Sequence, residues 1–286
     1  STPDSAANSV TGSITFIACA AYDDWTPATD DRAFISKWVT AGSQRSFIFR
    51  VNATTGTLQI VTSSDGSNAG LTTSTVATGF VDGTAHWIRA TLDSAADVVN
   101  FYTSDESALT PYADLSWNLL GDPDQAHTTG VFDGASDVEV GAIEAGTSDL
   151  VEGSIIRAVI IPSTDPTAAA SVDFYPQPYL QGDTNFTSVT GELWTLQGNA
   201  IATSPIDDGV KVDFNANDYV AGQTFESSGT NAEVWTLQGN AKAFTPLSQA
   251  IDVDGSSDGW TSPDSAAASI TGDIFLAGWG APDDWT

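Results

Sequence analysis

Short apolar runs with a period of two residues divide this sequence, and they are the feature that most restricts its fold. In the run SFIFRVN, Phe47, Phe49 and Val51 share one face of a strand. Ile48 and Arg50 then share the opposite face. No window shows the 3.6-residue apolar stripe of an amphipathic helix. The pattern predicts an all-β protein that has no helix longer than about two turns.

Eleven such runs lie within the first 175 residues. Turn sequences such as ATTGT, SSDGSN and VDGTA separate them. This spacing predicts an antiparallel sandwich of two sheets. We expect strands at 13–22, 33–39, 46–52, 57–62, 74–80, 86–92, 98–103, 129–132, 137–143, 154–161 and 171–175.

The chain also repeats its own beginning. Residues 2–26 recur as 262–286 at a constant offset of 260, with 14 of 25 positions identical. A match of this length indicates tandem modules. We therefore expect one module at 1–203, followed by a linker and the opening segment of a second copy at 204–286.

A second duplication marks the junction between the modules. Residues 172–202 are echoed by 212–243, and both segments contain WTLQGNA. We interpret the first as the closing segment of module one and the second as the opening segment of module two, and we expect both to follow one backbone path. On this interpretation module one lacks its own opening strands, and the chain is an excerpt from a longer tandem protein.

The charge balance excludes two classes of partner. Eight Lys and Arg residues face 37 Asp and Glu residues, which gives a net charge of −29. Nucleic acid and anionic membrane surfaces both require clustered basic residues, so neither is expected as a partner. Cys19 is the only cysteine and lies among apolar residues, so we expect a buried, inert thiol and no intrachain disulfide.

Several segments together resemble a known group of domains. They are SPDSAA, ITGD, DDW, FISKW, AGSQRSFIFRVN, GTLQ, ATGFVDGTAHWIRATLD, VNFYTSD, GVFDG, VEVGA and GSIIRAVII. These pieces resemble the laminin-G-like branch of the concanavalin A-like jelly rolls. More narrowly, they are similar to the copies of that domain in minor tail and fibre proteins of tailed bacteriophages. The resemblance implies a jelly-roll fold and a structural role, although the fold also hosts lectins and hydrolases.

A hydrolytic site has little support in the sequence. Some relatives of this fold cleave glycans with paired carboxylates on one strand face, and Asp137 and Glu139 are spaced for that, with Glu144 following. The E-x-D-x-x-E pattern of laminarinase-like hydrolases is absent, so we expect this pair on a solvated outward face. His86 and His127 lack a nucleophile in a suitable context, and we expect His86 to be partly buried at the start of a strand.

Calcium is the metal that the residue types favour. Its oxygen ligands are abundant, and the pair Asp23 and Asp24 recurs at 283 and 284, with Asp30 and Asp31 close by. These four aspartates form the candidate calcium site. The alternative is that one aspartate caps a turn and Trp25 packs beneath it.

The nine tryptophans raise the question of carbohydrate binding, because exposed aromatic faces stack on sugar rings. Trp25 and Trp117 lie in loop-like stretches and are the candidates for exposed, carbohydrate-binding rings. The remaining tryptophans of interest lie within strand patterns and are expected to be buried. They are Trp38, Trp87, Trp194 and Trp235.

Two functional hypotheses follow. The first is a non-enzymatic structural and adhesive module on a virion surface, in a phage tail fibre, minor tail or decoration protein, with weak carbohydrate binding. The alternative is a secreted or cell-surface tandem-repeat adhesin of a bacterium or archaeon. The expected partners are other copies of the chain in head-to-tail assembly, other virion proteins and a host surface glycan. We expect residues 261–286 to be completed by a neighbouring copy.

Overall fold

The computed structural model describes residues 1–176, 184–198 and 200, together with the backbone of five short strands between 224 and 261. The chain forms two compact units, Ser1–Ser204 and Pro205–Thr286. Within the described residues the single helical element is one 3-10 turn, η1 (Tyr112–Asp114). None of the described helical structure has the length and apolar character that a membrane span requires.

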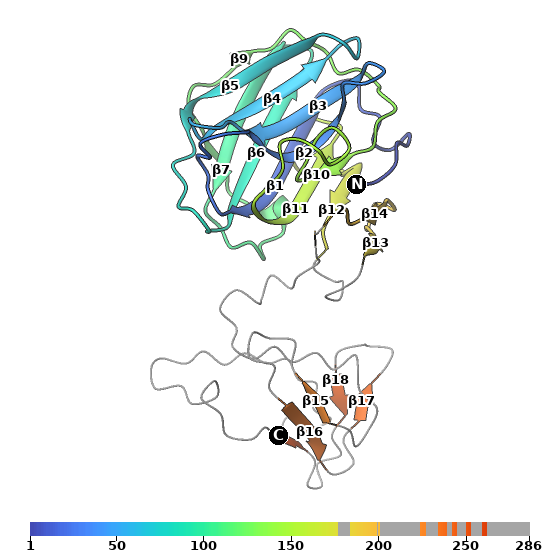
Figure 1. Cartoon of the computed structure of the whole chain (residues 1–286). Helices are drawn as coiled ribbons and strands as arrows, with labels where there is room; N and C mark the ends of the chain where they lie inside the picture. Colours follow the sequence, from blue (N-terminus) through green and yellow to red (C-terminus); the bar gives the residue numbers. More distant parts are fainter. Residues whose placement is uncertain are drawn as a thin grey trace. The chain divides into compact units, whose positions relative to one another are not determined.

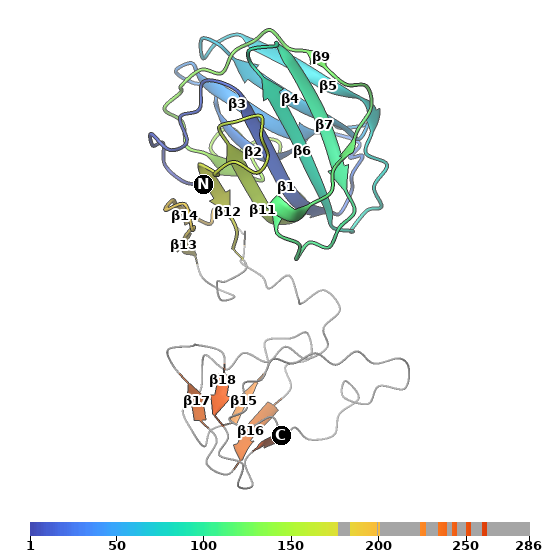
Figure 2. The ribbon, with the colours of Figure 1, turned by 180° about the vertical axis from the view of Figure 1, so that it is seen from behind.

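The first unit is a jelly-roll sandwich of two antiparallel sheets. The five-stranded sheet, in front in Figure 1, has the order β10-β2-β3-β4-β5. The seven-stranded sheet, in front in Figure 2, has the order β12-β11-β1-β6-β7-β8, with β9 also paired to β7. Its strands are β1 (Ile14–Tyr22), β6 (His86–Asp93), β7 (Val98–Ser104), β8 (Asn118–Leu119), β9 (Gln125–Ala126), β11 (Gly153–Ile161) and β12 (Val172–Phe174). The other sheet contains β2 (Arg32–Val39), β3 (Gln44–Val51), β4 (Thr57–Ser63), β5 (Ala69–Ala77) and β10 (Glu139–Val140).

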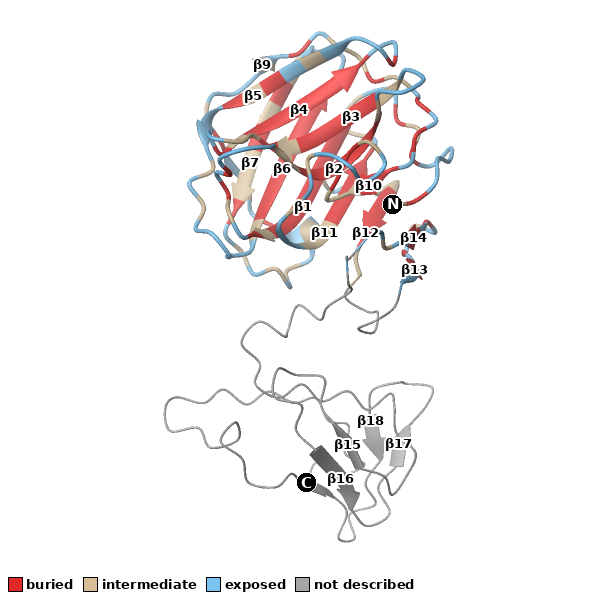
Figure 3. Cartoon of the chain, viewed as in Figure 1, coloured by how far each residue is buried: buried red, intermediate tan, exposed pale blue. Residues whose placement is uncertain are grey.

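Aromatic side chains from both sheets fill the space between them. Phe16 of β1 packs against Phe47 and Phe49 of β3, with ring centroids 5.0 and 5.9 Å apart. All three side chains are fully buried. Figure 3 shows in red that much of both sheets is buried. The period-two pattern of each strand thus directs its apolar face into one shared core.

The outward face of the seven-stranded sheet is divided into two regions. At one end Ile17, Cys19 and Trp87 are buried beneath Leu115 and the loops around it. At the other end the outward side chains of β6 and β7 are less deeply buried, and Asp93, Asn100 and Tyr102 are partly exposed. This second region is the open part of the face.

Eight predicted strands agree with the structure to within two residues at each end: β1, β2, β3, β4, β6, β7, β11 and β12. Three predictions were wrong in position or extent. The strand expected at 74–80 is β5, at 69–77, and only 139–140 of the strand expected at 137–143 forms one. Residues 129–132 form no strand, although the backbone N–H of Phe132 donates to the Ser63 carbonyl.

A small hairpin follows the sandwich. Strands β13 (Asn185–Thr187) and β14 (Leu193–Thr195) pair with Phe186 opposite Trp194. In the second unit β15 (Thr224–Glu226) pairs with β16 (Val234–Gln238), which also pairs with β19 (Gly259–Thr261). Strands β17 (Lys242–Phe244) and β18 (Ala250–Asp252) form a separate pair. The repeated segment 262–286 lies outside the described residues.

Candidate functional site

The open region of the outward face is built by two neighbouring strands in fixed register. On β6 the side chains of Thr91 and Asp93 point outward, because Ala90 and Leu92 between them face the core. Their cross-strand partners on β7 are Asn100 and Val98. The register therefore places Thr91 beside Asn100 and Asp93 beside Val98 on one surface, so the two outward rows are mainly polar.

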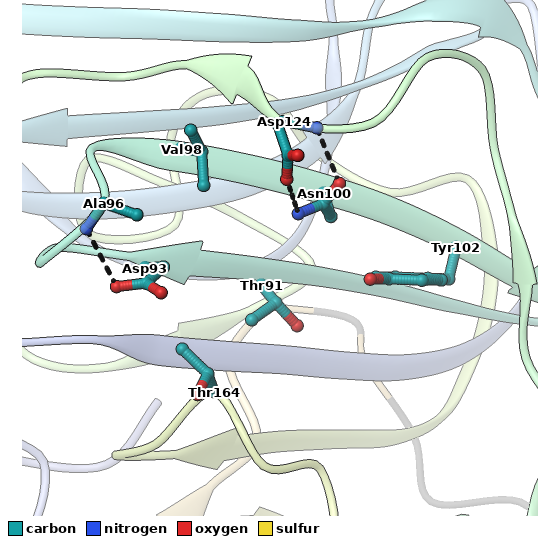
Figure 4. Close-up of a pocket in the computed structure, with 8 residues that line it drawn as sticks. All are labelled: Thr91, Asp93, Ala96, Val98, Asn100, Tyr102, Asp124 and Thr164. Atoms are coloured by element: carbon teal, nitrogen blue, oxygen red, sulfur yellow. Dashed lines mark hydrogen bonds between the residues drawn. The ribbon is translucent and has the colours of Figure 1, made fainter.

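A hollow of about 380 Å³ lies over these rows (Figure 4). This volume falls within the range of about 300–1,000 Å³ that is usual for small-molecule sites. The hollow is open to solvent and its lining is mainly polar. The lining residues are Thr91, Asp93, Ala96, Val98, Asn100, Tyr102, Asp124 and Thr164.

Hydrogen bonds hold the polar side chains of the hollow in place. The Asn100 amide donates to Asp124 Oδ1 at 3.1 Å, and Asn100 Oδ1 accepts from the Asp124 backbone N–H at 2.8 Å. Asp93 Oδ1 accepts from the backbone N–H groups of Ala95 and Ala96, at 2.9 and 3.1 Å. Each of these carboxylates has a second oxygen, and none of the described hydrogen bonds occupies it. Such oxygens are strong acceptors for ligand hydroxyl groups.

Tyr102 supplies the aromatic surface of the hollow. Its side chain extends along the sheet toward Thr91 (Figure 4) and is partly exposed. The guanidinium carbon of Arg89 lies 3.8 Å from the centroid of the Tyr102 ring and 4.7 Å from that of Trp117. Arg89 is only 7% exposed, and burial lowers its pKa. These cation–π contacts fix the orientation of the Tyr102 ring.

The structure places the two predicted carbohydrate-binding tryptophans differently. Trp117 is half-buried and stacks on Arg89 beside the hollow, without lining it. Trp25 is 1% exposed and stacks on Tyr22 at a centroid distance of 4.7 Å. The expectation that Trp25 is exposed was therefore wrong, because the loop folds its ring into the core. Tyr102, which lines the hollow, was not among the predicted site residues.

The loop around Trp25 has the alternative structure that the sequence left open. Asp24 Oδ1 accepts from the Thr26 backbone N–H at 2.8 Å, so this aspartate caps a turn. The Trp25 backbone N–H is bound by Asp82 instead, at 2.9 Å. The turn thus directs Trp25 inward, as expected if the DDW motif serves packing.

The four aspartates of the predicted calcium site do not share a set of contacts. Asp31 Oδ2 lies 2.8 Å from the Arg50 guanidinium, while Asp23 and Asp30 are exposed. Within the described residues no three acidic, His or Cys side chains gather closely enough to hold a metal ion. Calcium binding by these loops stays a prediction, and a calcium titration followed by thermal melting tests it.

The two carboxylates considered for hydrolysis differ in exposure, because Asp137 is exposed and Glu139 is buried. Glu139 is 3% exposed, and its two oxygens accept from the backbone N–H groups of Ala145 and Gly146 at 2.9 and 2.7 Å. Burial raises the pKa of Glu139. The expected outward position was therefore wrong for Glu139, whose carboxylate holds a turn. Asp137 is exposed, as expected, and its Oδ2 accepts from the Ser1 hydroxyl at 3.3 Å.

Three further predictions concerned buried groups, and the structure confirms them. Cys19 is fully buried, and burial raises the pKa of its thiol to about 12. His86 begins β6 and is partly buried against Phe80, with the rings parallel and 3.8 Å apart. The tryptophans expected inside strands are at most 7% exposed where their side chains are described, which are Trp38, Trp87 and Trp194.

Comparison with known proteins shows the fold alone. No family model matches the sequence, and no curated protein matches it. The structure is similar to the CBM40 of the Ruminococcus gnavus IT-sialidase bound to α2,3-sialyllactose, at 11% identity over 54% of this chain and 78% of that one, with a TM-score of 0.38. It is also similar to a putative carbohydrate binding protein of Bacteroides ovatus, at 10% identity over 71% and 58% of the two chains, with a TM-score of 0.43. A third similar structure is a SAP-like pentraxin of Limulus polyphemus, at 9% identity over 58% of this chain and 78% of that one, with a TM-score of 0.32. At these identities and scores the likeness carries no argument about ligands.

Proposed function

We propose that the sandwich is a non-enzymatic module that binds a glycan in the hollow over β6 and β7. The observation that carries this proposal is one partly exposed aromatic ring beside oriented carboxylate, amide and hydroxyl groups. Tyr102 offers a face to the C–H groups of a sugar ring, and Asp93 and Asp124 accept hydrogen bonds from its hydroxyls. The open shape of the hollow and its few polar groups favour weak binding.

The charges of the hollow favour a neutral sugar over an acidic one. Asp93 and Asp124 are both in the lining, and no Lys or Arg is. The cation nearest to Tyr102, Arg89, is buried against its ring. A carboxylate-bearing sugar would therefore meet two negative charges without a compensating cation. We expect neutral oligosaccharides to bind at least about tenfold more tightly than their sialylated counterparts, or about 1.4 kcal/mol.

A glycan array followed by calorimetry tests this proposal. Tyr102→Ala should weaken the affinity for the best neutral glycan about tenfold, because it removes the stacking surface. Tyr102→Phe keeps that surface and should retain most of the affinity. Leu71→Ala, on the exposed edge strand of the other sheet, is the matched control and should have no effect. An array without any hit, or a Tyr102→Ala protein that binds normally, would contradict the proposal.

For the wider setting, we propose a structural and adhesive component of a tailed-phage virion, exposed at the virion surface. The motif resemblance, the acidic composition and the repeated segments support it. The alternative, a secreted or cell-surface tandem-repeat adhesin, fits the same features. The flanking protein sequence separates them, because a tail-attachment region indicates a virion component, whereas a cell-wall anchor indicates an adhesin.

A further inference from the structure

Two hairpins of this chain have the same local pairing. In the first, Phe186 of β13 lies opposite Trp194 of β14. In the second, Phe225 of β15 lies opposite Trp235 of β16. Each tryptophan begins the identical sequence WTLQGNA. The two hairpins are therefore equivalent in register as well as in sequence.

Each hairpin also pairs with a residue that stands two positions before the proline of a PDS sequence. Ser1 and Thr195 exchange two backbone hydrogen bonds, with N···O distances of 2.9 and 2.8 Å. In the second unit Thr236 pairs with Thr261. Thr236 corresponds to Thr195 within WTLQGNA, and Thr261 corresponds to Ser1 at the offset of 260. The same contact thus occurs twice, but in opposite chain order. Hairpin β13–β14 follows its partner Ser1 in the chain, whereas hairpin β15–β16 precedes its partner Thr261.

Only one hairpin can occupy this position at a time. The Ser1 amino group donates to the Thr195 carbonyl, and the Ser1 carbonyl accepts from the Thr195 N–H, so both backbone groups of Ser1 are directed to this hairpin. The next residue, Thr2, directs its own pair to Val138 on the other side. The opening segment is therefore filled on both sides, and a second hairpin must displace the first.

The hairpin that occupies the position is anchored by one aromatic cluster. Trp194 is 1% exposed and packs edge-on against Phe174, with centroids 4.9 Å apart. Beside this anchor, however, a groove of about 310 Å³ separates the hairpin from the PDS turn, and Val189 and Leu193 remain exposed. Exchange for an equivalent hairpin would keep the backbone hydrogen bonds at Ser1 and the Phe–Trp pair, and it requires β16 to release its own pairing with β19.

We propose that the opening segment at Ser1 is a docking site for a WTLQGNA hairpin, and that β15–β16 of a second copy of this chain can replace β13–β14 there. The contact is heterologous, because one copy supplies the hairpin and the other supplies the opening segment. It can therefore continue from copy to copy in a head-to-tail array. The proposal specifies the self-assembly expected from the sequence and does not depend on glycan binding.

Disulfide trapping in the full chain tests the exchange. In a Ser1→Cys/Thr236→Cys protein the two thiols meet only when β15–β16 pairs with a Ser1 segment, because the Cα atoms of a hydrogen-bonded antiparallel pair lie about 5.5 Å apart, within disulfide range. Cys19 is buried and does not compete. In a glutathione redox buffer we expect the monomer band to shift to dimers and longer ladders as protein concentration rises. Ser1→Cys/Thr195→Cys, which traps the observed pairing, should give linked monomers.

Variants that change the competition make the test specific. Ser1→Cys/Leu237→Cys shifts the thiol to the opposite strand face and should not cross-link. In the Ser1→Cys/Thr236→Cys background, Trp194→Ala weakens the resident hairpin and should raise the dimer yield. Thr195→Pro should have the same effect, because it removes the backbone N–H that donates to the Ser1 carbonyl. Protection of Cys19 from thiol reagents reports that either variant stays folded. The proposal is overturned if no disulfide forms between positions 1 and 236, or if Ser1→Cys/Leu237→Cys gives the same yield of cross-linked protein. Disulfides that form only within monomers would also overturn it.

Discussion

The opening turn of the sandwich is held by a buried lysine, and its removal has a predictable cost. Lys37 of β2 is 1% exposed, and its ammonium group lies 2.5 Å from Asp4 Oδ1 and 3.0 Å from Asn8 Oδ1. The Asp4 side chain is 37% exposed, whereas Asn8 is fully buried. The ion pair is therefore asymmetric, since water can reach the anion but not the cation.

This asymmetry decides which substitution costs more. Asp4→Ala leaves the buried ammonium with one carboxylate, that of Asp133, at 3.9 Å and beyond hydrogen-bond distance, so we expect the free energy of unfolding to fall by about 3–5 kcal/mol. Lys37→Met removes the buried charge, and water hydrates the exposed part of Asp4. The remaining cost is one of the two hydrogen bonds that Asn8 Oδ1 accepts, since the Ser5 backbone N–H still donates to it, and we expect about 1–3 kcal/mol.

Equilibrium denaturation followed by tryptophan fluorescence measures both variants. Asp4→Ala should be the less stable, by about 2 kcal/mol, as the difference between the two ranges above. The double variant Asp4→Ala/Lys37→Met should be more stable than the sum of the single effects, because the buried charge is then absent. If Lys37→Met is the more damaging single change, or if the two effects simply add, the reasoning is refuted.

Three other outcomes follow from buried groups. Gly153→Ala should destabilise the sandwich by more than about 3 kcal/mol in the same assay, because φ is +122° and the new Cβ would lie 2.3 Å from the Ala21 carbonyl oxygen. His127 lies between the hydroxyls of Thr62 and Thr72, and burial lowers its pKa below the usual 6.5. Its contribution to stability should be complete above pH 6.5 and fall as the pH drops toward the folded-state pKa, because the unfolded chain binds the proton more readily. The difference in unfolding free energy between wild type and His127→Gln should show this slope, and a flat difference contradicts it. Cys19 should react with a thiol reagent only after denaturant is added, whereas fast labelling of the folded protein contradicts its burial.

Strand existence could be predicted because alternation and turn chemistry are local properties, but two tertiary effects were beyond local reasoning. Val131 is 7% exposed and reaches the core from a loop, so an apolar residue there indicated a strand that does not form. β5 begins before the predicted start, and its Gly70 is required because a Cβ there would lie 1.9 Å from Thr129 Oγ1. A neighbour 59 residues away, the difference between 129 and 70, leaves no signal in the strand itself.

The candidate site was predictable only in part. The sequence shows that Asn100 and Tyr102 share a strand face, and a polar face with one aromatic residue was a usable signal. The register that sets Thr91 beside Asn100, and the loop that brings Asp124 to them, come from tertiary structure. Trp25 was chosen for its loop context, which does not reveal that the Asp24 turn directs the ring inward.

Backbone amide shift mapping with a neutral oligosaccharide tests the central claim most directly. A two-dimensional NMR titration of the ¹⁵N-labelled protein reports which residues contact the sugar. We predict saturable shifts at Thr91, Asp93, Asn100, Tyr102 and Asp124, and weaker shifts when the same sugar carries sialic acid. Saturable shifts confined to other surfaces, or none with any neutral glycan, would contradict the assignment of this hollow as a carbohydrate-binding site.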